Sequence, residues 1–195
     1  MNPLKHIFIL VTLLVTLAFT VVTKESTSVV ITPSSKLVIN GKTNINSFTC
    51  EFNVLKLKNP IPIFYKKGAN NMLFENTVLV LDNNCFDCGG KEINNDFQKL
   101  LKSHQFPQIH IKLHEITTAL NNKDSLFARF DISIAGVTKS CTIPVELKQK
   151  EALFIKGLIN LNISDFNLQP PKKVLGLIVV KDAIEINFQL QVKEY

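Results

Sequence analysis

Hydrophobic and polar residues alternate along most of this chain, a pattern typical of β-strands that bury one face. The alternation is clearest over residues 182–193, where every second side chain from Ile184 to Val192 is apolar. Comparable segments lie at residues 36–40, 47–55, 72–81, 108–114, 125–135, 140–148 and 153–161. They predict about eight strands with hairpin-length connections, and the half-buried faces favour an antiparallel sheet.

One stretch of the chain has a helical period instead. Phe97, Leu100 and Leu101 have the i, i+3, i+4 spacing of one helix face, which predicts a single short helix near residues 94–103. One of the two asparagines at its start would cap it. We expect this helix to cover one end of the sheet.

A sheet of about eight strands must protect its edges, and closure into a barrel does so most completely. We therefore expect an all-β fold, an antiparallel barrel with the one helix inserted. A β-sandwich is the alternative, because periodicity does not separate the two. A turn signal at Asn40-Gly41 and a break at residues 59–62 separate the first strands, and residues 25–35 indicate a linker or a first edge strand.

Residues 1–24 have the layout of a secretory signal peptide. Lys5 forms a short positive region, and residues 7–22 are apolar and uncharged. An uncleaved membrane anchor is the alternative, although about 16 apolar residues is short for a span of about 20. We expect cleavage near residues 20–25 and a single domain over residues 25–195. In either case the domain lies outside the cytoplasm, in a periplasm or secreted.

Four cysteines, Cys50, Cys85, Cys88 and Cys141, occur in a chain that we expect to be exported, which predicts disulfides. Three pairings exist, and the residues alone leave the choice open. Cys85 and Cys88 also form a C-x-x-C motif, which acts as a redox centre when it begins a helix after a strand. Here two glycines follow the motif instead. Structural bridging is the favoured interpretation.

The net charge is +6 and the pI is near 9.1, but the lysines are spread along the chain. No basic stripe with interleaved aromatic residues is present, which argues against nucleic-acid binding. A diffuse basic surface either assists transient contact with anionic lipid or is simply solvated.

The chain has no G-x-S-x-G motif, no H-E-x-x-H motif and no glycine-rich phosphate loop. His110 and His114 lie four residues apart on the polar face of a predicted strand. At about 13 Å by strand rise they are too far apart to share one metal ion. We therefore expect no enzyme activity, no metal site and no cofactor.

Four segments together resemble the YceI-like family of exported lipid-binding barrels, especially its members from Bacteroidetes. They are SKL at 35–37 with FTC at 48–50; FDCG at 86–89 with NDF at 95–97 and FPQI at 106–109; IAGVTK at 134–139 with TIPV at 142–145; and SDF at 164–166 with PP at 170–171 and IEINF at 184–188. They follow the family's order, with the helix in the expected place. Cys85, Cys141 and the segment at 90–93 depart from the family pattern.

The resemblance implies a lipocalin-like barrel that holds a long apolar ligand, typically a polyisoprenoid chain. It also suggests a disulfide pairing. Cys50 and Cys88 fall in motif positions and would form one bridge, Cys50–Cys88, while the two additional cysteines would form the other, Cys85–Cys141. Because Cys50 and Cys141 both lie on apolar strand faces, a bridge between them is the alternative.

Closing the sheet turns the apolar strand faces inward, and these faces carry mostly large side chains. A small barrel that packs itself usually alternates small and large residues. The inward set therefore forms either a dense core or the lining of a tunnel. The candidate ligand-binding residues are Phe48, Phe52, Ile109, Ile111, Phe130, Ile132, Leu153, Ile155, Ile184, Ile186 and Phe188. Candidates for contact with a phosphate head group at a mouth are Lys66, Lys67, Lys172 and Lys173.

Three functions compete on these grounds. The first is an exported binding protein that holds a polyisoprenoid or similar lipid for transport, storage or sequestration, with transient membrane contact and homodimerisation as further expectations. The second is a ligand-free structural or stress-related envelope protein with a filled barrel. The third is a thiol redox protein that uses Cys85 and Cys88. A carrier requires an interior open to the surface, whereas a redox centre requires a lowered thiol pKa.

Overall fold

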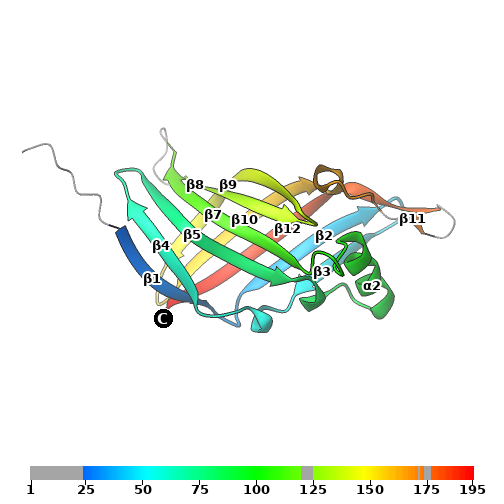
Figure 1. Cartoon of the computed structure of the whole chain (residues 1–195), viewed down its shortest axis with the longest axis horizontal. Coiled ribbons are helices and arrows are strands. Elements are labelled where there is room, and N and C mark those ends of the chain that lie inside the picture. The colour runs from blue at the N-terminus through cyan, green and yellow to red at the C-terminus, as the bar shows by residue number, and fades with distance from the viewer. Residues whose placement is uncertain (1–23, 120–124, 171, 174–176) are drawn as a thin grey trace, which may run out of the picture.

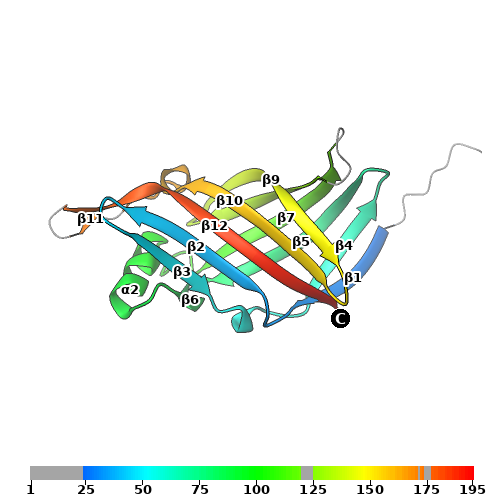
Figure 2. The same cartoon turned by 180° about the vertical axis from the view of Figure 1, so that it is seen from behind.

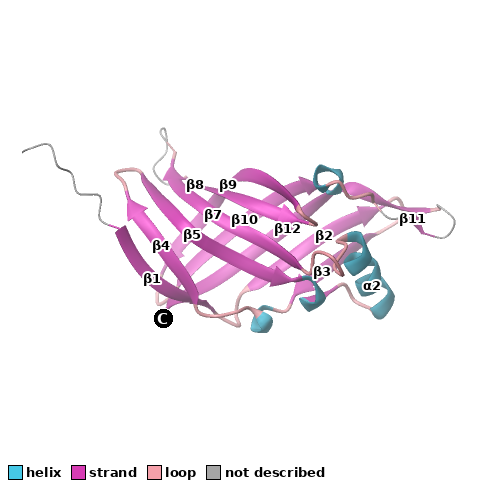
Figure 3. Ribbon diagram, viewed as in Figure 1, coloured by secondary structure: helices cyan, strands magenta, loops and turns pink. Residues whose placement is uncertain are grey.

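The structure is a computed structural model that describes residues 24–119, 125–170, 172–173 and 177–195. Strands dominate these residues, as Figure 3 shows. The strands are β1 (Lys24–Ile31), β2 (Lys36–Thr43), β3 (Ser47–Phe52), β4 (Ile61–Lys67), β5 (Asn71–Asp82), β6 (Phe86–Asp87), β7 (Gln108–Thr118), β8 (Leu126–Ile134), β9 (Val137–Gln149), β10 (Leu153–Asn162), β11 (Lys172–Lys173) and β12 (Ile178–Glu194). The helices are α2 (Lys91–Leu100) and the 3-10 turns η1 (Val54–Lys56), η2 (Asn83–Cys85) and η3 (Ile163–Phe166).

Eight strands form a closed ring in the order β1-β4-β5-β7-β8-β9-β10-β12, and pairing of β1 with β12 closes it. The pairs within the ring are antiparallel, as the half-buried alternation predicted. Figures 1 and 2 show the strands running obliquely around one long axis. The prediction of an all-β antiparallel barrel of about eight strands is confirmed. The sandwich is excluded because the sheet is continuous around the ring.

The longest strand, β12, joins the ring to an extension made of β2, β3 and β6. Residues 180–189 of β12 pair with β2, and residues 192–194 pair with β1. The helix α2 lies beside this extension (Figure 1). Leu101, at the end of the helix, is buried in the main apolar cluster, the larger of two groups of contacting buried side chains, and Phe97 packs against that cluster. The helix therefore covers this end of the barrel, as expected.

The helix begins earlier than its apolar spacing indicated. It runs over Lys91–Leu100 rather than 94–103, with a glycine at its N-cap. Asn94 lies inside the helix and does not cap it: its side chain accepts a hydrogen bond from the N–H of Cys88 at 2.6 Å and donates one to Asp87 at 3.1 Å. Asn94 thus attaches the helix to the segment that follows β6, a tertiary role that local pattern does not reveal.

The turn predicted at Asn40-Gly41 is wrong. Both residues lie inside β2, and the chain reverses at residues 44–46 instead. Gly41 faces Phe48 across the pair of β2 and β3, and a side chain at position 41 would overlap the Phe48 ring. The glycine therefore serves close packing between strands rather than a turn.

The first part of the ring also differs from expectation. The sequence pattern predicted either a linker or a first edge strand for residues 25–35. In the structure, residues 24–31 form β1, which pairs with a strand on each side and is a full member of the ring. Residues 61–67 form β4 although Pro62 interrupts the alternation. Pro62 is exposed, while Ile61 and Ile63 on either side of it belong to or pack against the second apolar cluster. The strand tolerates the proline because its apolar side chains still share one inward face.

The predicted signal peptide falls on residues 1–23, which lie outside the described residues, and on Lys24, the first residue of β1. The predicted start of the folded domain at residue 25 is thus close to the start of the ring. In the part of the chain that the structure describes, no helix combines the length and the apolar character that a membrane span requires.

Candidate functional site

The eleven residues predicted to bind a ligand all lie in the apolar clusters of the barrel. Those in or against the main cluster are Phe48, Phe52, Ile109, Ile111, Phe130, Ile132, Ile184, Ile186 and Phe188. Leu153 and Ile155 pack against the second cluster, which is formed by Ile31, Ile61 and Val192. The structure therefore places the predicted set in two apolar clusters, and two of its members, Phe48 and Phe52, lie on β3 of the extension rather than on a strand of the ring.

The exposure of inward side chains changes along the barrel. On β7, Ile109 near the helix end is 5% exposed, whereas Ile111 is only partly buried. On β10, Ile159 is 4% exposed, whereas Ile155 is only partly buried. Because the strands form a closed ring, the side chain of Ile111 faces the space that the ring encloses, whereas Ile155 also contributes to the lining of a surface hollow. Inward side chains are thus less completely buried at Ile111 and Ile155 than next to α2, whereas Ile31, Ile61 and Val192 of the second cluster are buried.

Two of the predicted phenylalanines lie against a glycine of the neighbouring strand, Phe188 within the ring and Phe48 within the extension. Phe188 faces Gly157 across β10 and β12, and Phe48 faces Gly41 across β2 and β3. At both glycines an added Cβ would overlap the ring, so each ring covers the bare backbone opposite it. A ring in this position takes less room in the middle of the barrel than one that projects inward.

The start of β1 and the hairpin between β4 and β5 lie at the end of the barrel away from α2 (Figure 1), and their side chains form an ion-pair network. Lys24 of β1 and Lys66 of β4 lie 2.6 Å and 2.7 Å from the carboxylate of Glu75 on β5. The hydrogen bond from Lys24 has the largest effect on the pKa of Glu75, followed by the one from Lys66, and together they lower it to about 2. The network links three neighbouring strands of the ring.

A second polar group at this end contains Glu25, Tyr65 and Lys67. The Tyr65 hydroxyl donates a 2.6 Å hydrogen bond to Glu25, and the Lys67 ammonium lies 3.2 Å from the same carboxylate. The hydrogen bond from Tyr65, followed by that from Lys67, lowers the pKa of Glu25, while Glu25 raises the pKa of Tyr65. These charges satisfy one another, so they do not form an unpaired cationic site.

The four lysines predicted to meet a phosphate group do not gather at one mouth. Lys66 and Lys67 are paired with glutamates at the end away from α2. Lys172 and Lys173 form β11 at the opposite end (Figure 1), and their side chains lie outside the described part of the chain. A phosphate site built from all four is therefore excluded.

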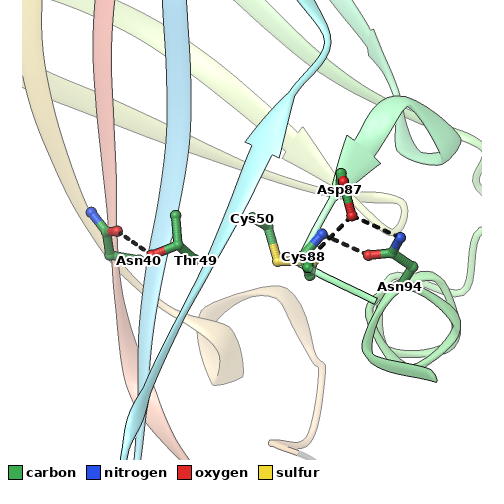
Figure 4. The surroundings of a disulfide bond; sticks show 7 residues. Asn40, Thr49, Cys50, Asp87, Cys88 and Asn94 are labelled. Carbon is green, nitrogen blue, oxygen red and sulfur yellow. Dashed lines mark hydrogen bonds between the residues drawn. A yellow bond between two sulfur atoms is a disulfide. The ribbon is translucent and has the colours of Figure 1, made fainter. Parts of the chain in front are cut away.

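One predicted disulfide is present. Cys50 of β3 and Cys88 are bonded beside α2, and Cys50 is completely buried (Figure 4). Asn94 extends this connection into the helix through its hydrogen bond to Cys88. On β3, the neighbouring Thr49 donates to Asn40 of β2 at 3.2 Å. The disulfide thus fixes the helix-bearing segment to the extension of the sheet.

The predicted Cys85–Cys141 bridge is wrong, and so is the alternative bridge between Cys50 and Cys141, because Cys85 and Cys141 are free thiols. The two face different surroundings: Cys85 lies in η2 near Asp82, and Cys141 lies on β9 opposite Phe130. Burial, and then nearby carboxylates, raise the pKa of both thiols. A C-x-x-C motif with one weakly acidic thiol and one cysteine bonded elsewhere does not meet the requirement for a redox centre.

Two hollows lie on the outer surface, and Ile155 is the one residue of the predicted set that contributes to their lining. The larger, about 540 Å³, follows α2 and the turn after it, and every residue that lines it has a polar side chain. The smaller, about 330 Å³, lies over β9, β10 and β12, and three lysines contribute to its lining. Neither offers the apolar enclosure that a hydrophobic ligand requires, so the barrel interior is the candidate site.

Part of the interior face was not predicted from the sequence. Ile61, Ile63 and Tyr65 of β4 share the inward face, but the break at Pro62 hid them. Their own spacing of two residues is the signal that identifies this strand. Thr77 of β5 was also missed, because a polar residue in an apolar strand is usually assigned to the outer face.

Fold and site together define an antiparallel barrel with an apolar interior, covered at one end by a helix. Among the described residues, no group of three or more His, Cys, Asp or Glu side chains is arranged to hold a metal ion. A family model described as the YceI-like domain matches residues 67–192, and the chain belongs to that family. No curated protein matches the chain.

Several solved structures share this fold. BcnA of Burkholderia cenocepacia is 18% identical, with a TM-score of 0.63 over 84% of this chain and 99% of its own. A polyisoprenoid binding domain from Saccharophagus degradans, implicated in plant cell wall breakdown, is 12% identical, with a TM-score of 0.57 over 86% of this chain and 98% of its own. The YCEI protein of Campylobacter jejuni is 14% identical, with a TM-score of 0.51 over 63% and 73% of the two chains. At these identities the likeness establishes the fold.

Proposed function

We propose that this protein binds a long apolar amphiphile, a polyisoprenoid or a similar lipid, inside the barrel and performs no catalytic step. The observation that carries the proposal is the incomplete burial of inward apolar side chains, such as Leu79, Ile111 and Leu113, within a closed ring. Such surface leaves water only when another apolar group fills the space, which is favourable. The proposed lining is the set of eleven inward residues.

The energetics favour an extended hydrocarbon chain as the ligand. Each CH₂ group that leaves water contributes about 0.8 kcal/mol, and ordering the chain offsets part of this gain. A long chain therefore binds without a charged anchor. This suits a barrel whose charged residues at the end away from α2 are paired with one another.

The choice of a polyisoprenoid among long lipids is supported by the fold shared with the Saccharophagus degradans domain, which is described as polyisoprenoid binding. The narrow, elongated interior of an eight-stranded ring admits one slender chain rather than a broad ring system. Transport, storage or sequestration is the role that follows from binding alone.

We also infer that residues 1–24 direct export and are removed, and that the protein acts outside the cytoplasm. The apolar N-terminal segment and the Cys50–Cys88 disulfide support this compartment. Ile45 and Leu177 are 65% and 70% exposed and lie near each other, since Asn44 donates to the Leu177 carbonyl. These exposed apolar residues support transient membrane contact. Homodimerisation stays a prediction.

The test compares two tryptophan variants of β7. Ile111→Trp places a large side chain in the interior. His110→Trp places the same side chain one position earlier on β7, on the exposed outer face of the strand. Affinity for geranylgeraniol is measured by displacement of an environment-sensitive dye. We expect Ile111→Trp to weaken binding at least about tenfold without lowering the melting temperature, because the indole occupies existing space, and His110→Trp to bind like the wild type.

The opposite result identifies the filled barrel. If the wild type takes up no prenyl lipid and Ile111→Trp melts at a much lower temperature, then the interior is a packed core that tolerates no further atoms. The structural or stress-related envelope protein is then the correct function.

A further inference from the structure

Thr77 carries a buried hydroxyl that has no partner. The residue lies on β5 and is 6% exposed, and its Oγ1 makes no hydrogen bond to any described residue. A hydroxyl removed from water without a new hydrogen bond is disfavoured, and folded proteins rarely retain one without a reason. A valine would occupy the same volume without this disadvantage. The hydroxyl therefore needs a functional explanation.

The hydroxyl lies on the inward face of the barrel. Thr77 alternates with Leu79 and Leu81, which pack against or belong to the main apolar cluster. Its partner on β7 is Leu113, and the partner of Leu113 on β8 is Phe130. Along this row Thr77 is thus a polar group among apolar side chains, and Leu79 and Leu113 are only partly buried. Thr77 thus lies beside inward side chains whose burial is incomplete.

A local irregularity of β5 determines this orientation. Asn76 has a φ of 53°, and the register with β7 shifts between Leu73 and Thr77. The pairing with β4 also stops at Glu75. A bulge of this kind re-aims the side chains that follow it. Here it directs the Thr77 side chain into the barrel.

We propose that the Thr77 hydroxyl hydrogen-bonds an uncharged oxygen of the bound lipid, an alcohol, ether or carbonyl, held inside the barrel. The proposal rests on the proposed function and adds the orientation of the ligand. β5 begins with Asn71 at the end of the barrel away from α2, and Thr77 lies about 20 Å further along this strand. The polar group of the lipid thus points inward. A phosphate at this depth would be a buried charge beside Leu113 and Phe130, which is strongly disfavoured.

The test uses phytanol and phytane, which share one branched chain and differ by a single oxygen. Thr77→Val keeps the shape of the side chain and removes the hydroxyl, and Thr77→Ser keeps the hydroxyl. We expect Thr77→Val to weaken phytanol binding about fivefold, the effect of one net hydrogen bond, and to leave phytane binding unchanged. Thr77→Ser should keep the wild-type preference for phytanol. Ligand-free Thr77→Val should melt at a higher temperature than the wild type, because an unsatisfied hydroxyl has been removed.

The other outcomes separate this role from lipid binding itself. An equal effect of Thr77→Val on both probes, or no effect on either, overturns the role of Thr77 and leaves the proposed function standing; a buried water on the hydroxyl would give this result. Phytanyl phosphate that binds more tightly than phytanol, and equally to Thr77→Val, overturns the inward orientation. Uptake of neither probe by the wild type overturns the proposed function, and the role of Thr77 with it.

Discussion

Two glycines determine where the neighbouring phenylalanine rings pack. Gly157 and Gly41 have no side chain where the rings of Phe188 and Phe48 cover the neighbouring strand. Each glycine leaves space for the phenylalanine ring to lie against the backbone of the neighbouring strand. The alternation of each strand predicts that both phenylalanines face inward, but it does not show where their rings lie, because that depends on the residue opposite in the partner strand.

Gly157→Ala should push the Phe188 ring away from the wall and into the interior. We expect it to lower the free energy of unfolding by about 1–3 kcal/mol, the usual effect of overpacking, and to weaken lipid binding as well. Urea unfolding and lipid titration measure the two effects. Leu158→Ala is the control, since Leu158 is the next residue and is 38% exposed. A Gly157→Ala variant as stable as the wild type would contradict this packing.

Glu75 makes part of the stability dependent on pH. Its pKa falls from 4.5 to about 2 in the folded protein, because Lys24 and then Lys66 bind the charged form. A carboxyl group with a lowered folded-state pKa stabilises the fold above its unfolded pKa, and this contribution is lost as the pH falls toward the folded value.

Glu75→Gln should therefore be less stable than the wild type at neutral pH, and the difference should disappear as the pH falls from 4.5 toward about 2. Urea unfolding across this range checks the prediction. The result should also weaken in high salt, because the three side chains are partly exposed. A difference that stays constant with pH would show that the ion pairs are not its cause.

At the scale of elements, the chain's pattern predicts some segments better than others. β7 and β12 follow from uninterrupted alternation, whereas β4 is hidden by Pro62. The start of α2 is missed because Asn94 makes tertiary hydrogen bonds rather than a cap. Alternation also reports which side chains share a face but not which strands pair. The double pairing of β12, with β2 and with β1, is therefore visible only in the structure.

The Cys50–Cys88 disulfide should stabilise one element more than the rest. The two cysteines are 38 residues apart, so removing the bond with Cys50→Ala and Cys88→Ala should lower the free energy of unfolding by about 2–4 kcal/mol. Hydrogen exchange should rise first in residues 86–101, because the bond fixes this segment to β3. Cys85→Ala, which removes a free thiol, is the control for losing a cysteine near η2. A uniform rise in exchange over all strands would contradict a local role.

At the scale of the whole molecule, one closed ring encloses two apolar clusters, the larger of them beside α2. Closure of the sheet was predictable, because edge protection favours it, and alternation predicted the inward face of six of the eight ring strands but missed β1 and β4. The free state of Cys85 and Cys141 was not predictable from the sequence, since it depends on the distance between the two cysteines in the fold. Whether Phe and Ile side chains fill an interior or line it also depends on where each side chain lies. The same apolar pattern serves both, and here the incomplete burial of Ile111 supports the proposed lining.

Native mass spectrometry of the purified protein, followed by extraction and identification of bound lipid, tests the central claim most directly. We predict a complex with one lipid per barrel, a polyisoprenoid or another long apolar chain, that is lost in the Ile111→Trp variant and kept in His110→Trp. A bare protein mass that remains bare after incubation with polyprenyl lipid would contradict the account and identify the barrel as a filled structural domain.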